Sequence, residues 1–116
     1  MKATLYHNPR CSKSRAALAL LEERRVEIEV VTYVEASLGQ EEFERIVGLV
    51  GGAPIELVRT GDAAFKDTGV ELGEHATAQE VAQVLAAHPT LMQRPVVAVG
   101  DRAVIARPTE RILELL

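Results

Sequence analysis

Short apolar runs alternate with amphipathic stretches along the chain and predict alternating strands and helices. Residues 2–6 form an apolar run that indicates a first, buried strand. Over 12–24, Leu18 and Leu21 have helical spacing, and over 26–33 apolar and polar residues alternate as in a half-exposed strand. A strand, a helix and a strand in this order form a βαβ unit, so we expect the two strands to be parallel.

The middle of the chain is predicted to be helical. Ser37 with Gln40 resembles a capping box at the start of a helix over 37–50. Glycines divide residues 54–74 into short helical turns. A second capping-box pattern begins another amphipathic helix over 77–88.

The last part of the chain predicts a hairpin and a helix. Residues 95–99 are continuously apolar and indicate a buried strand. A Gly-Asp turn follows, so 102–106 should return as the antiparallel partner. Pro108 suits the first turn of a final helix. The apolar face of that helix would carry Ile112, Leu113 and Leu116.

The resulting order is β-α-β, a helical block and β-β-α. Without the block, this order is the thioredoxin-like arrangement, an α/β fold with a mixed four-stranded sheet and helices on its faces. The helical insertion between the βαβ and ββα halves covers about 37–88. With 116 residues, 47% of them hydrophobic, the chain suits a single domain over 1–116.

The only cysteine, Cys11, lies where the first predicted strand ends and the first helix begins. The unpaired amides and the positive dipole end of a helix stabilise a thiolate over a thiol. His7, Arg10, Lys13 and Arg15 add positive charge nearby. In such surroundings cysteine pKa values fall from ~8.5 to roughly 3.5–7.5. We interpret Cys11 as an activated nucleophile beside an anion site, whereas a buried, inert cysteine is the alternative.

Composition excludes several classes of protein. A net charge of −4 argues against a nucleic-acid binder. The sequence lacks the long apolar stretch of a membrane span and the apolar region of a signal peptide, so neither is expected. Three scattered histidines and one cysteine lack zinc-ligand spacing, so no metal is expected. One cysteine cannot form an internal disulfide, which fits a reducing cytoplasm. Any redox cycle must therefore take its second thiol from another molecule.

Four segments carry a resemblance to a known family. They are Tyr-His-Asn-Pro-Arg-Cys-Ser-Lys-Ser-Arg (6–15), Leu-Val-Arg (57–59), Leu-Met-Gln-Arg-Pro-Val-Val (91–97) and Ala-Arg-Pro-Thr-Glu (106–110). Together, and in this order, they resemble the glutaredoxin-dependent arsenate reductases, over nearly the whole chain. The loop after the cysteine is more basic than in the best-characterised members of that family.

The resemblance implies a reaction. The cysteine that matches Cys11 attacks arsenate and forms a covalent thiolate–arsenate adduct. Glutathione, the co-substrate, displaces oxygen from arsenic, and glutaredoxin resolves the mixed disulfide as arsenite is released. No tightly bound cofactor is implied.

The resemblance also assigns roles to further residues. Arg59, Arg94 and Arg107 would surround the oxyanion, and His7 would help to lower the pKa of the cysteine. The Arg94–Pro95 peptide bond would be cis. Independently of the family, the open end of the predicted hairpin should bring Arg94 and Arg107 together, and guanidinium groups match tetrahedral oxyanions.

The sequence allows two roles for Ser14 and more than one function for the chain. Ser14 stands where a Cys-x-x-Cys motif has its second cysteine, and its hydroxyl would either donate to the Cys11 thiolate or cap the helix. Two other functions share the fold. A glutathione-dependent thiol transferase would need Cys11 but not the arginines, and a Spx-like regulator that binds RNA polymerase commonly carries Cys-x-x-Cys.

Overall fold

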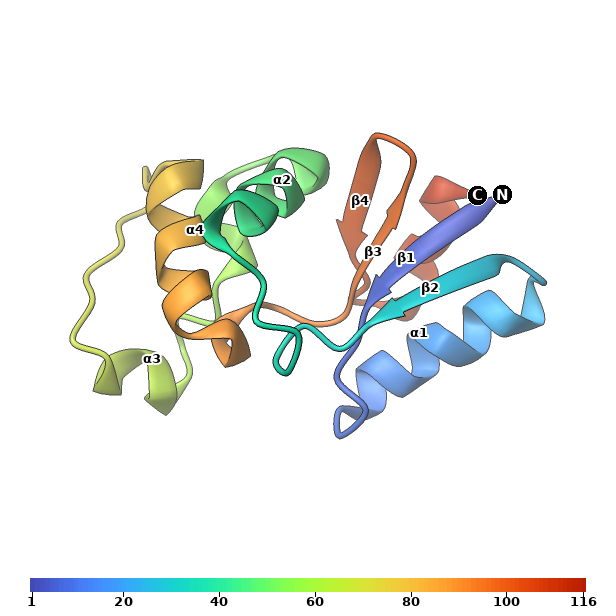
Figure 1. Cartoon of the computed structure of the whole chain (residues 1–116), viewed down its shortest axis with the longest axis horizontal. Coiled ribbons are helices and arrows are strands. Elements are labelled where there is room, and N and C mark those ends of the chain that lie inside the picture. Colours follow the sequence, from blue (N-terminus) through green and yellow to red (C-terminus); the bar gives the residue numbers. More distant parts are fainter. The chain divides into compact units, whose positions relative to one another are not determined.

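The computed structural model describes all residues 1–116. Strands from the N-terminal and C-terminal parts of the chain form one mixed four-stranded sheet with the order β2-β1-β3-β4 (Figure 1). β1 (Lys2–Tyr6) is parallel to β2 (Glu27–Val31). β3 (Val96–Val99) is antiparallel to both β1 and β4 (Arg102–Ile105). The predicted βαβ unit, the hairpin and the α/β fold class are confirmed.

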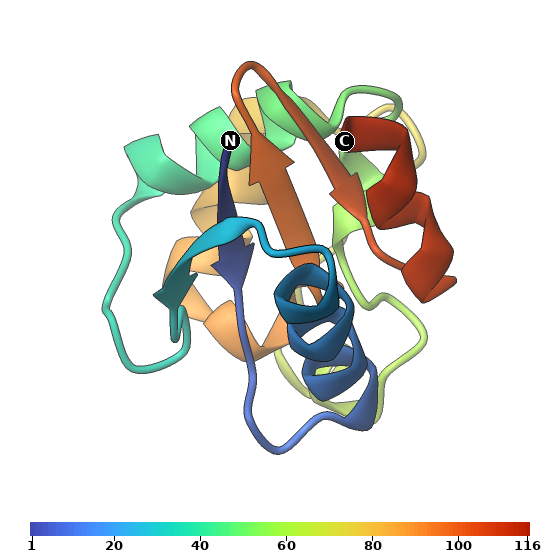
Figure 2. The same ribbon diagram turned by 90° about the vertical axis from the view of Figure 1, so that its right-hand side faces the viewer.

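One face of this sheet is covered by α1 (Ser12–Glu23) and by the 3₁₀ helix η3 (Thr109–Leu115), which lie side by side (Figure 2). Small and aliphatic side chains form the core between them and the sheet, and their burial is the main favourable term in folding. The buried members of this core are Ala3, Leu5, Ala17, Leu21, Val97, Ala106 and Ile112.

The chain forms two compact units. The first joins Met1–Ala36 to Arg94–Leu116, and the second is Ser37–Gln93. The second unit therefore begins where the helical insertion was predicted to begin and extends a few residues beyond its predicted end. The assignment of the whole chain to a single domain stays a prediction.

The regular elements of the second unit are helices. Its elements are α2 (Gln40–Val50), η1 (Pro54–Leu57), α3 (Ala63–Asp67), α4 (Ala78–Ala87) and η2 (Pro89–Leu91). α2 and α4 lie side by side and have buried apolar faces (Figure 1). A single β-bridge between Val58 and Met92 connects the segments after η1 and η2.

The two predicted capping boxes differ in outcome. The box at the start of α4 is confirmed, because the Thr77 and Glu80 side chains each accept a hydrogen bond from the other residue's backbone N–H. The box at Ser37 is wrong. Ser37 lies in a turn with φ +52°, and Gly39 is the N-cap, so Gln40 is the first residue of α2 and lies too early in the helix for the pairing.

The final helix is a 3₁₀ helix, and the predicted apolar face is wrong in part. Pro108 precedes the first turn in an extended conformation. With three residues per turn, Ile112 and Leu115 lie on one face and pack against the core. Leu113 and Leu116 lie on another face, and each is 39% exposed. None of the helices combines the length and the apolar composition needed to cross a lipid bilayer.

Candidate active site

The register of the sheet brings three chain segments to one edge. Tyr6 at the end of β1 pairs with Val96 at the start of β3, and Val96 pairs with Ile105 at the end of β4. The residues just after β1, just before β3 and just after β4 therefore lie at the same end of the sheet. These segments carry His7, Cys11, Arg94, Pro95 and Arg107, and Ser14 and Arg15 follow in the first turn of α1.

The hairpin brings Arg94 and Arg107 together. The Arg107 Nε donates a hydrogen bond to the backbone carbonyl oxygen of Arg94, and the Ala106 N–H donates to the carbonyl oxygen of Pro95 at 2.9 Å. The Arg94–Pro95 peptide bond is cis, and so is the Arg107–Pro108 bond, which no sequence pattern indicated.

Cys11 is the N-cap residue of α1 and is partly exposed. Burial alone would raise the pKa of its thiol. Four contributions outweigh burial and lower the pKa to about 7. They are the backbone N–H of Ser14, a side-chain hydrogen bond from Arg94, the backbone N–H of Lys13 and the charge of Arg94. The lowered pKa favours the thiolate near neutral pH, and a guanidinium group lies beside the sulfur. This arrangement suits a nucleophile that attacks an anion.

The hydroxyl of Ser14 binds the loop that precedes Cys11. Ser14 is fully buried, its Oγ lies 2.6 Å from His7 Nδ1, and it accepts a hydrogen bond from the Asn8 N–H at 3.0 Å. The N-cap has no side-chain hydrogen bond, and Ser14 lowers the pKa of Cys11 through its backbone N–H. The structure therefore gives the hydroxyl neither of the two roles that the sequence left open.

The exposed side chain of Arg15 also binds the loop that precedes Cys11. Its Nη1 donates to the carbonyl oxygen of Pro9 at 2.8 Å. His7 is buried, at 7% exposure. Burial lowers the pKa of the His7 imidazole below 6.5, and the charge of Arg15 lowers it further. The imidazole is therefore neutral at neutral pH, and the nearby positive charge comes from the arginines.

Asn8 is a site residue that the sequence analysis missed. Its carbonyl oxygen accepts from the Cys11 N–H at 3.0 Å, its side-chain Oδ1 accepts from the Arg10 N–H at 3.0 Å, and its own N–H donates to Ser14. The dipeptide Asn-Pro favours the start of a turn and was the available signal. Asn8 shapes the turn that delivers Cys11 to the start of α1.

Arg59 belongs to the second unit. Its guanidinium forms an ion pair of 3.3 Å with Asp62, and its backbone N–H donates to the carbonyl oxygen of Leu91 at 2.8 Å. The other oxygen of Asp62 accepts from the Ala64 N–H at the start of α3, so Asp62 is fixed as well. The participation of Arg59 in oxyanion binding stays a prediction.

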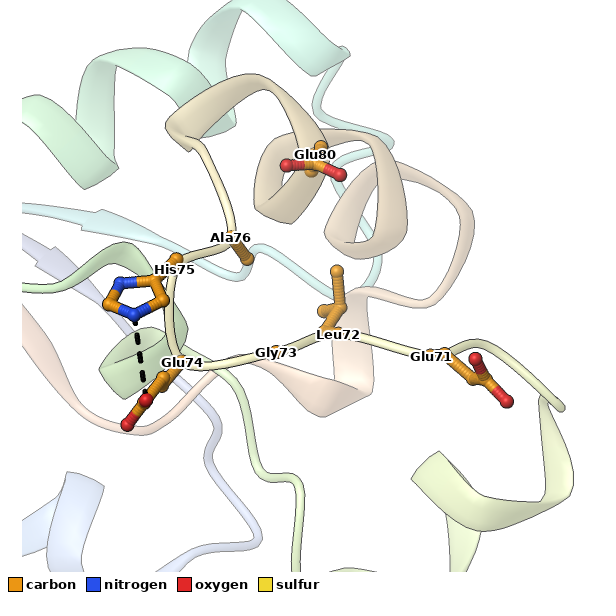
Figure 3. A pocket seen from close by; sticks show the side chains of 7 residues that line it. All are labelled: Glu71, Leu72, Gly73, Glu74, His75, Ala76 and Glu80. Carbon is orange, nitrogen blue, oxygen red and sulfur yellow. Dashed lines mark ion pairs between the residues drawn. The ribbon is translucent and has the colours of Figure 1, made fainter.

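The second unit also has an open pocket around the segment that precedes α4 (Figure 3). Its carboxylates come from Glu71, Glu74 and Glu80, and Glu74 forms an exposed ion pair of 3.5 Å with His75. None of the predicted site residues lines this pocket. The candidate active site is therefore the Cys11 loop with the open end of the hairpin.

Comparisons with known proteins agree on one family. The model of the ArsC family matches residues 6–115. A Neisseria meningitidis protein named arsenate reductase is 37% identical over 97% of this chain and 96% of its own, and a Haemophilus influenzae arsenate reductase is 34% identical over the full length of both chains. The solved structure of an arsenate reductase from Vibrio cholerae has a TM-score of 0.86 and 34% identity, covering 100% of this chain and 98% of its own.

Proposed function

Because the chain belongs to the ArsC family, we propose that it reduces arsenate to arsenite and that the Cys11 thiolate is the nucleophile. The observation that carries this proposal is the position of Cys11, at the start of α1 and beside the Arg94 side chain, which lowers the pKa of the thiol to about 7. A thiolate and arsenate are both anions, so their encounter requires local positive charge. The names of the relatives supply the choice of arsenate as substrate.

In the first step, the Cys11 sulfur attacks arsenic. A sulfur–arsenic bond forms, one arsenic–oxygen bond breaks, and the oxygen leaves as water after protonation, while arsenic stays pentavalent. Arg94 and Arg107, linked at the open end of the hairpin, bind the remaining oxygens. We propose Arg59 as a third oxyanion ligand on the basis of the family resemblance alone.

The second thiol comes from outside, because Cys11 is the only cysteine in the chain. We take this thiol to be glutathione. Its sulfur displaces a second oxygen from arsenic as water. The two sulfurs then bond to each other as both sulfur–arsenic bonds break, and two electrons stay on arsenic, which becomes trivalent. With one water added, the arsenic leaves as arsenite.

Glutaredoxin would complete the cycle. A glutaredoxin thiolate attacks the glutathione sulfur of the mixed disulfide, and the Cys11 thiolate is the leaving group. Its low pKa favours departure, because thiols of lower pKa leave faster. The reaction needs a supply of reduced glutathione, which the cytoplasm provides.

The test is arsenite release from arsenate by the purified protein with glutathione and glutaredoxin. We expect turnover by the wild-type protein and none by Cys11→Ser, which places a hydroxyl of much higher pKa at the same position. A parallel reaction with thioredoxin in place of glutathione and glutaredoxin identifies the reductant. Turnover with thioredoxin alone would contradict the glutathione step, and no arsenite in either reaction would contradict the arsenate assignment.

A further inference from the structure

The loop around Cys11 is positively charged although the chain as a whole is acidic. Residues 7–15 include three Lys or Arg residues and no acidic residue, whereas the whole chain has a net charge of −4. The first turn of α1 also contains no acidic residue. The excess of positive charge is therefore local to the segment that carries the nucleophile.

Of these three residues, Arg15 already forms a hydrogen bond within the loop, because its side chain donates to the carbonyl oxygen of Pro9. Arg10 and Lys13 differ from it. Both are exposed, and neither side chain makes a hydrogen bond or an ion pair in the structure. Exposed and unpaired charges are free to bind a ligand at little cost in protein interactions.

These two charges are also not what ionises Cys11. Lys13 lowers the pKa of the thiol through its backbone N–H, and the side chain that lowers it is that of Arg94. Arg10 and Lys13 nevertheless flank the sulfur, one residue before it and two residues after it. Since consecutive Cα atoms are about 3.8 Å apart, both side chains can reach a molecule that approaches Cys11.

We propose that Arg10 and Lys13 form the docking site for the carboxylates of the small anionic thiol that attacks the adduct on Cys11. Glutathione is the thiol of this class in the proposed function, on which the inference rests, and it carries two carboxylates. The site attracts the thiol to the exposed side of the adduct and raises its local concentration. Arg94 and Arg107 then remain available for the oxyanion.

The first experiment reverses the two charges. In the double variant Arg10→Glu, Lys13→Glu, we expect the KM for glutathione in arsenate reduction to rise about tenfold, while the KM for arsenate changes less than about twofold. The matched control is Arg24→Glu, Arg25→Glu, which changes the net charge equally at the other end of α1. Equal effects of the two double variants would overturn the proposal. So would a rise in the KM for glutaredoxin with no change for glutathione.

The second experiment needs no arsenate. Reduced Cys11 reacts with an anionic aromatic disulfide, dithiobis(nitrobenzoate), or with an uncharged one, dithiodipyridine. The charge reversal should slow the anionic reagent about tenfold relative to the neutral one, and about 1 M salt, where the Debye length is ~3 Å, should remove the difference. An unchanged ratio of the two rates overturns the docking site. Absence of arsenite from the wild-type protein instead overturns the proposed function, so the two failures are distinguishable.

Discussion

The Nε of Arg107 donates a hydrogen bond of 2.8 Å to the backbone carbonyl oxygen of Arg94. This bond holds the guanidinium group of Arg107 against the backbone of Arg94. The Nε of Arg94 is buried without a hydrogen-bond partner, and the Arg94 side chain hydrogen-bonds to Cys11. Arg94 therefore stabilises the thiolate, and in the proposed function the terminal nitrogens of Arg107 join Arg94 in binding the oxyanion.

The first prediction concerns the planar fork of Arg107. Arg107→Lys keeps the positive charge but loses the Nε–H that bonds to Arg94 and the paired donors that match an oxyanion. We expect the KM for arsenate to rise about tenfold, which corresponds to the loss of one charge-assisted hydrogen bond of about 1.5 kcal/mol. Steady-state arsenite release measures this.

The control for this prediction is Arg102→Lys, at the other end of β4, which should leave the KM for arsenate unchanged. The same variants also separate two functions. A thiol transferase does not need Arg107, so its disulfide exchange with glutathione should survive in Arg107→Lys. Equal arsenate kinetics in the wild-type and Arg107→Lys proteins would remove Arg107 from the oxyanion site.

The second prediction concerns the thiolate. Arg94→Gln removes a hydrogen bond and a positive charge that favour the anion, so the pKa of Cys11 should rise from about 7 by about 1. A titration of the ultraviolet absorbance of the thiolate measures the pKa directly. The rate of alkylation at pH 7 should fall in parallel. An unchanged titration curve would mean that the helix amides alone hold the thiolate.

Local patterns predicted most of the first unit. The strand positions of Val96 and Val97 and the turn after them follow from apolar spacing and turn chemistry, which act over few residues. The proximity of Arg94 and Arg107 follows from the hairpin itself. The start of α2 could not be predicted in this way, because Ser37 and Gln40 have capping chemistry and the chain instead turns through a left-handed conformation at Ser37.

Other features depend on contacts that a sequence pattern does not encode. The final helix is 3₁₀, with Ile112 and Leu115 packed against the core, and a list of apolar residues does not distinguish this period from that of an α-helix. The hydrogen-bond partners of Ser14 could not be predicted from the sequence either, because its hydroxyl meets His7 and Asn8 only when β1 and α1 are packed together. The sequence analysis placed His7 and Ser14 at the site, but it did not predict the hydrogen bond between them.

The third prediction concerns that hydroxyl. Ser14→Ala leaves the His7 Nδ1 and the Asn8 N–H without their partner in a buried position, which should lower the free energy of unfolding by about 1–3 kcal/mol. Urea denaturation measures the loss. Because Ser14 acts on Cys11 through its backbone N–H, the pKa of the thiol should change less than in Arg94→Gln. A larger rise in Ser14→Ala would instead show that the hydroxyl donates to the thiolate.

The fourth prediction is a dependence of stability on pH that His7 causes. Burial and the charge of Arg15 lower its pKa below 6.5 in the folded protein, whereas the unfolded chain has the ordinary value of 6.5. Between these two values the unfolded state binds more protons, so the free energy of unfolding rises with pH and falls as pH decreases through 6.5. The slope for one such group is at most about 1.4 kcal/mol per pH unit.

Urea denaturation between about pH 5 and pH 7 tests this dependence, since the unfolded histidine titrates there. His7→Gln should be less stable at pH 7, because it loses the imidazole that faces Ser14, but its stability should fall less steeply with acid than that of the wild-type protein. His75→Gln is the matched control, because the His75 side chain is 93% exposed, and it should keep the wild-type slope. If His7→Gln retained the full slope, the acid sensitivity would belong to the carboxylates, and the buried imidazole would not be its source.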